Sequence, residues 1–80
     1  MTAQTEDILA AIDGLLGECG SDRSKLLSAT IWLTDMRAFA EMNAVWDAWI
    51  DPQNPPARAC VESRLAAPGF DVEIGIIAAR

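Results

Sequence analysis

The residues best suited to chemistry lie in the stretch 54–62, which reads Asn-Pro-Pro-Ala-Arg-Ala-Cys-Val-Glu. Two consecutive prolines restrict the backbone just before an alternating segment that is typical of a β-strand. Because side chains alternate along a strand, we expect Arg58, Cys60 and Glu62 on one face. A guanidinium beside a thiol is suited to binding an anion, since the planar fork of donors on Arg matches a carboxylate.

A second interpretation of the same pattern has no ligand. Glu62 follows Arg58 two places along the same strand face, so the two side chains could form an exposed ion pair. The pattern alone favours this ion pair. The opposite face of the strand is then expected to carry small and apolar side chains, namely Ala57, Ala59, Val61, Ser63 and Leu65.

Length, composition and charge limit the kind of protein that this chain can form and the partners that it can bind. Eighty residues allow one domain with a small core, and domains of this size often gain stability by association. The composition, with 51% hydrophobic and 22% charged residues, is that of a folded globular protein. The net charge is -6 and the six basic residues are scattered along the chain, which disfavours nucleic acid as a partner.

The cysteines and the apolar segments indicate where the protein works. Cys19 and Cys60 are the only thiols, and the chain has no histidine and no Cys-x-x-Cys motif, so we predict neither a zinc site nor a disulfide framework. No apolar run is long enough to span a bilayer, and the N-terminal residues are acidic and polar. These features predict a protein of the reducing cytoplasm that does not contact a membrane.

The first half of the chain must supply the elements that position Arg58. Residues 2–19 have a helical apolar stripe, with Thr2 or Thr5 as the expected N-cap and Gly20 as the expected stop. Residues 25–33 are rich in β-branched and apolar side chains and predict a buried strand. The apolar stripe of the first helix is formed by Ile8, Leu9, Ile12, Leu15 and Leu16.

The second half returns to a helix and ends in a strand. Residues 36–50 have helical periodicity, and Asn43 lies beside their apolar face. Residues 70–77 alternate as a strand and are expected to pair with the Arg58 strand as an antiparallel hairpin. The predicted order is α-β-α-β-β, an α+β fold with both helices on one face of the sheet. The apolar face of the second helix comprises Phe39, Met42, Trp46, Trp49 and Ile50, which we assign to packing.

Four segments in this order resemble the Rid family of YjgF-like reactive-intermediate (enamine/imine) deaminases. They are Ser-Ala-Thr-Ile-Trp-Leu-Thr-Asp-Met at 28–36, Phe-Ala-Glu-Met-Asn at 39–43, Pro-Ala-Arg-Ala-Cys-Val-Glu at 56–62, and the closing residues 72–80. The resemblance extends from about Thr5 to the end of the chain. It implies a single chorismate-mutase-like α+β domain over residues 1–80, assembled as a homotrimer with ligand clefts between subunits.

The resemblance also implies an activity. Members of the family hydrolyse short-lived 2-enamine or 2-imino acids to 2-oxo acids and ammonia without a cofactor. Arg58 matches the arginine that holds the substrate carboxylate, Cys60 matches a cysteine that lines the cleft, and Asn43 matches an asparagine of the second helix. An imine already reacts with water, so the site need only hold the acid group and position a water molecule.

Two departures from the family pattern accompany the match. The glutamate that can orient the attacking water aligns with Gly75, and Glu73 stands two places earlier on the same strand face as a substitute. The family's N-terminal strands have no counterpart before Met1. We interpret the chain as a fragment or a shortened relative, and expect reduced stability and association through an uncovered sheet edge.

Two further functions stay open beside imine hydrolysis, and Gly75 favours the first of them. A regulatory module that binds small carboxylates without chemistry would retain Arg58 and tolerate the loss of a catalytic glutamate. Some relatives are described as ribonucleases or translation inhibitors, and the net charge of -6 ranks that function third.

Overall fold

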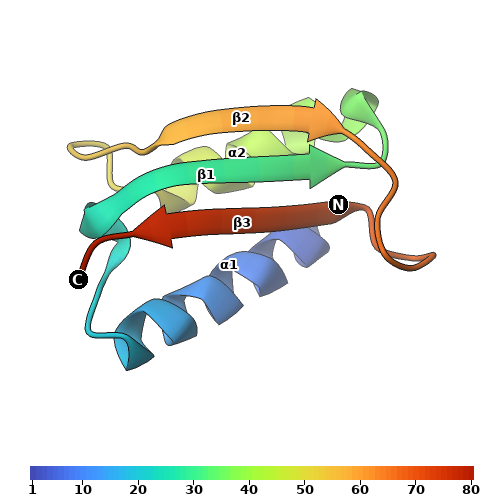
Figure 1. The fold of residues 1–80 in the computed structure, drawn as a ribbon. Coiled ribbons are helices and arrows are strands. Elements are labelled where there is room, and N and C mark those ends of the chain that lie inside the picture. The colour runs from blue at the N-terminus through green and yellow to red at the C-terminus, as the bar shows by residue number, and fades with distance from the viewer.

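The computed structural model describes residues 1–80 as two α-helices and a three-stranded sheet, in the predicted order α-β-α-β-β (Figure 1). The α+β prediction is confirmed. No helix is both long and apolar enough to cross a membrane. The elements are α1 (Thr2–Glu18), a 3₁₀ turn (Arg23–Lys25), β1 (Leu26–Leu33), a second 3₁₀ turn (Met36–Ala38), α2 (Phe39–Trp49), β2 (Ala57–Glu62) and β3 (Val72–Ala78).

The strand order differs from the prediction. The sheet runs β2-β1-β3, so β1 is central, parallel to β2 and antiparallel to β3. The predicted β2–β3 hairpin is therefore wrong. Residues 63–71 instead carry the chain past the end of β1, where Ser63 N–H donates to Leu33 O at 2.8 Å and Thr34 N–H donates to Asp71 O at 3.1 Å. The central place suits β1 because it is the most deeply buried strand.

Both helices pack on one face of the sheet, as predicted (Figure 1). The side chains of Ile31, Leu33 and Met42 have no exposed surface. The core consists of Leu9, Ile12, Leu16, Leu26, Ala29, Ile31, Leu33, Met42, Trp46, Trp49 and Val72. The other face of the sheet is covered by neither helix.

The first helix begins differently from the prediction and ends as expected. Met1 occupies the N-cap without a side-chain hydrogen bond, so neither Thr2 nor Thr5 is the cap. The Thr5 hydroxyl is buried and donates to Met1 O at 2.9 Å, which satisfies it inside the helix. Gly20 stops the helix at a φ of 74°, a conformation that favours glycine. Leu15 leaves the predicted apolar stripe and is 60% exposed.

The predicted bounds of three other elements also need correction. The helix expected from residue 36 begins at Phe39, because Asp35 accepts a hydrogen bond from Arg37 N–H and caps a separate 3₁₀ turn. Strand β2 ends at Glu62, so Ser63 and Leu65 lie beyond it. Strand β3 begins at Val72, and Phe70 lies outside it with 59% of its surface exposed.

One polar cluster ties the two helices together. The Asp13 carboxylate of α1 accepts hydrogen bonds from Arg23 Nε and Nη2 at 2.8 and 2.7 Å, and from Trp49 Nε1 of α2 at 3.0 Å. Arg23 also donates to Trp49 O at 3.0 Å and lies 5.1 Å from the Trp49 ring centroid. Asp13 therefore connects α1, the first 3₁₀ turn and the end of α2.

This cluster predicts a stability that depends on pH. Hydrogen bonding to Arg23 lowers the pKa of Asp13. The contribution is complete above the unfolded-state pKa of about 3.9 and disappears as the pH falls through the lower folded-state value. We expect Asp13→Asn to lower the melting temperature at pH 7, and the difference from wild type to shrink below about pH 4. Thermal unfolding followed by circular dichroism at several pH values measures this, and a difference independent of pH would contradict it.

Candidate functional site

Arg58 lies on β2 with its side chain against α2. It pairs in register with buried Ala29, which places it on the helix-covered face of the sheet. Its Nη1 donates to Asn43 Oδ1 at 2.5 Å. The guanidinium carbon lies 5.6 Å from the Phe39 ring centroid and 5.8 Å from that of Trp46, within the range of cation–π attraction. The structure thus brings together the predicted residues Arg58 and Asn43.

The donors of Arg58 are only partly used. Asn43 is the sole hydrogen-bond partner of its side chain, and Arg58 forms no ion pair within the chain. The Nε and Nη2 hydrogens together form the edge of the guanidinium that matches a carboxylate bidentately. A held but unneutralised guanidinium of this kind is suited to an anionic ligand.

The expected ion pair between Arg58 and Glu62 does not form. Glu62 Oε1 instead accepts a hydrogen bond from Met36 N–H at 2.9 Å. The first N–H groups of a helical turn lack partners within the turn, so a carboxylate at the end of β2 satisfies one of them. Glu62 therefore supports the start of the second 3₁₀ turn and leaves Arg58 available.

Cys60 follows Arg58 on the same face of β2 and is half-buried. Burial raises the pKa of the thiol, and the nearby Arg58 charge offsets this only in part. A thiol with a raised pKa is a poor nucleophile at neutral pH. Both cysteines of the chain are free. We therefore expect Cys60 to line the site beside Arg58 and not to act as a nucleophile.

Glu73 lies on the other face of the sheet. It pairs in register with Trp32, whereas its neighbours Val72 and Ile74 pair with Leu33 and Ile31 on the helix-covered face. Within one chain, Glu73 therefore lies on the opposite face of the sheet from Arg58 and Asn43. The sequence could not reveal this, because alternation within one strand does not relate its faces to those of another.

Gly75 shares the uncovered face with Glu73. A Cβ atom at position 75 would lie 3.3 Å from a ring atom of Trp32, so the indole occupies the space that a larger side chain would need. Sequence reasoning missed this role of Trp32. It also assigned Phe39 and Trp46 to packing alone, although both rings contact Arg58 as well.

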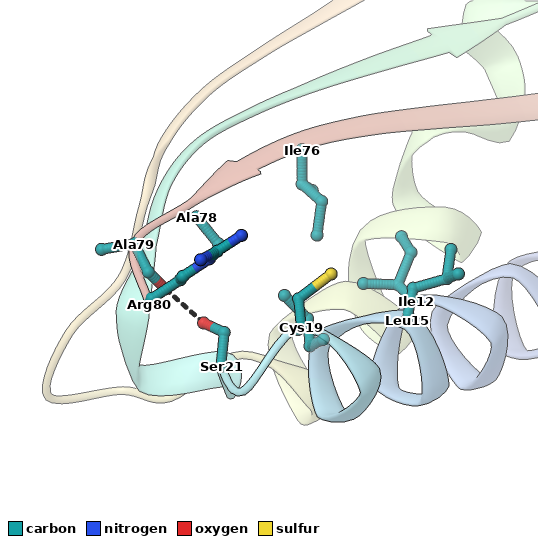
Figure 2. A pocket seen from close by; sticks show the side chains of 9 residues that line it. Ile12, Leu15, Cys19, Ser21, Ile76, Ala78, Ala79 and Arg80 are labelled. Carbon is teal, nitrogen blue, oxygen red and sulfur yellow. Dashed lines mark hydrogen bonds between the residues drawn. The ribbon is translucent and has the colours of Figure 1, made fainter.

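A separate apolar hollow of about 350 Å³ lies between α1 and the end of β3 (Figure 2). The side chains of Ile12, Leu15 and Ile76 face it, Arg80 stands at its margin, and the Ser21 hydroxyl donates to Ala79 O beside it. None of the predicted site residues lines this hollow. It is therefore distinct from the surroundings of Arg58.

Comparison with known sequences identifies similar proteins. The family model described as Endoribonuclease L-PSP matches residues 1–80. A RutC family protein of Haemophilus influenzae is 49% identical over 75 residues, which cover 94% of this chain and 65% of the relative. The RutC family protein YoaB of Escherichia coli is 46% identical over 76 residues, covering 95% of this chain and 67% of YoaB. The chain thus spans about two thirds of the length of these relatives.

Solved structures of similar sequence have the same fold as this chain. A YjgF family protein from Neisseria meningitidis is 56% identical with a TM-score of 0.94, covering 95% of this chain and 64% of that one. A protein of the conserved Rid family from Yersinia pestis is 29% identical with a TM-score of 0.89, covering 95% of this chain and 60% of that one. The arrangement of helices and strands is shared with these proteins.

Proposed function

Since the chain belongs to the Endoribonuclease L-PSP family and is similar to RutC, YjgF and Rid proteins, we propose that it hydrolyses reactive 2-imino acids without a cofactor. A 2-enamine enters the same reaction as its imine tautomer. Water adds to the carbon of the C=N bond, ammonia leaves, and a 2-oxo acid remains. The reaction needs an anchored carboxylate and an oriented water molecule, because the imine is itself electrophilic.

The observation that carries the proposal is that the Arg58 guanidinium is held in place but has no acidic partner. Asn43 holds Nη1, the rings of Phe39 and Trp46 support the guanidinium, and no acidic side chain neutralises it. Lys25, Arg64 and Arg80 also form no ion pair, but of these four cations only Arg58 is held by a side-chain hydrogen bond and by aromatic rings. We assign the Nε and Nη2 edge to the carboxylate of the substrate, with Cys60 as part of the adjacent wall.

Glu73 is the group proposed to orient the attacking water. Since Glu73 and Arg58 lie on opposite faces of one sheet, a substrate that contacts both must lie between two copies of the chain. This geometry requires at least two copies of the chain, and the homotrimer that the family resemblance implies, with its clefts between subunits, would supply them. The uncovered face also carries apolar side chains that a second copy would bury, among them Val61 at 44% and Ile77 at 63% exposure.

The assembly is tested by its mass. We expect light scattering to give three times the 8.6 kDa chain mass, and Ile77→Lys to release monomers by placing a charge on the uncovered face. Leu15→Lys is the matched control, since Leu15 is 60% exposed but belongs to α1, and it should leave the mass unchanged. A monomeric wild-type chain in the presence of 2-oxobutyrate would exclude the trimer.

The activity is tested with an imino acid generated in place by an amino acid oxidase. We expect the protein to accelerate the release of ammonia and 2-oxo acid above the spontaneous rate. Saturable binding of 2-oxobutyrate without acceleration would favour the alternative, a regulatory carboxylate-binding module. The observation in favour of that alternative is Trp32, whose ring fills the space that a larger side chain at position 75 would occupy.

A further inference from the structure

We propose that Asp47 is a positioning residue for the carboxylate site at Arg58, an inference that rests on the proposed function. Asp47 lies one turn after Asn43 on α2, and its Oδ2 accepts a hydrogen bond from Asn43 Nδ2 at 3.2 Å. The other end of the same amide accepts from Arg58 at 2.5 Å. The three side chains thus form a row that runs from an acid through an amide to the guanidinium.

The row determines which way the amide of Asn43 faces. A side-chain amide has one accepting and one donating end, whereas a carboxylate only accepts and a guanidinium only donates. With Asp47 bound to Nδ2, the oxygen must face Arg58. In the flipped amide two donors would meet at Arg58 and two acceptors would meet at Asp47, so both contacts would be lost.

The ordering of Arg58 by Asn43 and Asp47 should strengthen the binding of the substrate carboxylate. It should leave the rate of the chemical step unchanged. A free arginine side chain has many rotamers, and a ligand must overcome the loss of this entropy unless the protein has already ordered the side chain. Asn43 orders Nη1, and Asp47 keeps Asn43 in the orientation that does so. Asp47 forms no ion pair with Arg58, so it orders the cation without neutralising it.

The test compares Asp47→Ala with two control variants. In Asp47→Ala we expect KM for the imino acid and Kd for 2-oxobutyrate to rise about two- to fivefold, with kcat unchanged. Asp47→Asn retains an acceptor for Asn43 Nδ2 and should stay within about twofold of wild type. Asp7→Ala removes the same charge from α1, where Asp7 has no side-chain partner, and should equal wild type. Alanine favours the helix at position 47, so the variant should fold.

A double-mutant cycle separates positioning from a general effect of charge. If Asp47 acts through Asn43, then Asp47→Ala should have no further effect in an Asn43→Ala background. An undiminished effect in that background, a wild-type Kd for Asp47→Ala, or a loss confined to kcat would each overturn the role of Asp47. Arg58→Ala tells this failure apart from failure of the proposed function: if Arg58→Ala binds and turns over like wild type, the carboxylate site itself is wrong.

Discussion

Replacing Arg58 by alanine is expected to lower kcat/KM for imino acid hydrolysis roughly 30- to 150-fold. A hydrogen-bonded contact to a charged group contributes about 2–3 kcal/mol, and each 1.36 kcal/mol corresponds to a tenfold change. The loss should be large because no other cation lies beside Asn43 to take over the carboxylate. Steady-state kinetics with an imino acid generated in place measures it.

Two substitutions define what Arg58 contributes. Arg58→Lys retains the charge but loses the planar fork, so it should recover only part of the activity. Arg64→Ala removes one positive charge from an exposed side chain beyond β2 and should remain within twofold of wild type. Equal rates for wild type and Arg58→Ala would remove Arg58 from the mechanism. Equal losses in the Arg58 and Arg64 variants would reduce its role to long-range attraction.

Replacing Glu73 by glutamine is expected to have the largest effect, a loss of kcat of about 10²- to 10⁴-fold. Glutamine has the size of glutamate but cannot accept a proton from the attacking water, so KM should change little. Asp71→Asn is a matched control because it removes a nearby carboxylate that hydrogen-bonds Gln4. It should keep at least half of the wild-type kcat.

A mixing experiment tests whether Arg58 and Glu73 meet between copies of the chain. If each site takes Arg58 from one copy and Glu73 from another, equal mixing of Arg58→Ala with Glu73→Gln chains should leave about one site in four intact. The mixture should then regain about a quarter of the wild-type activity after joint refolding. If both residues act from the same chain, no intact site can form and the mixture should stay inactive.

Several features of the site follow from local sequence alone. Alternation along residues 57–62 correctly places Arg58 and Cys60 on one face of a strand, since a β-strand repeats every two residues. Helical spacing places Asn43 beside the buried residues Met42 and Trp46, as observed in α2. Each of these results depends on neighbours within a few positions in the chain.

Other features were decided only by the tertiary structure. The partner of Glu62 is Met36, from a turn 26 residues earlier, and the partner of Arg58 is Asn43, 15 residues earlier. No local pattern distinguishes these partners from an ion pair between Arg58 and Glu62, because the spacing of residues along β2 carries no information about residues so far away in the chain. The contact forms because β2 pairs beside β1 and passes over α2.

The order of the strands is the clearest case. The alternation of β2 and β3 is compatible with a hairpin, yet both strands pair with β1, whose apolar residues are best buried at the centre of the sheet. The register of the two pairings with β1 then determines which residues share a face of the sheet, and it places Glu73 on the face opposite Arg58. Residue types and their local spacing were thus determined by the sequence itself. Which of these residues can meet was decided by long-range strand pairing, because a two-residue repeat carries no information about the neighbouring strand.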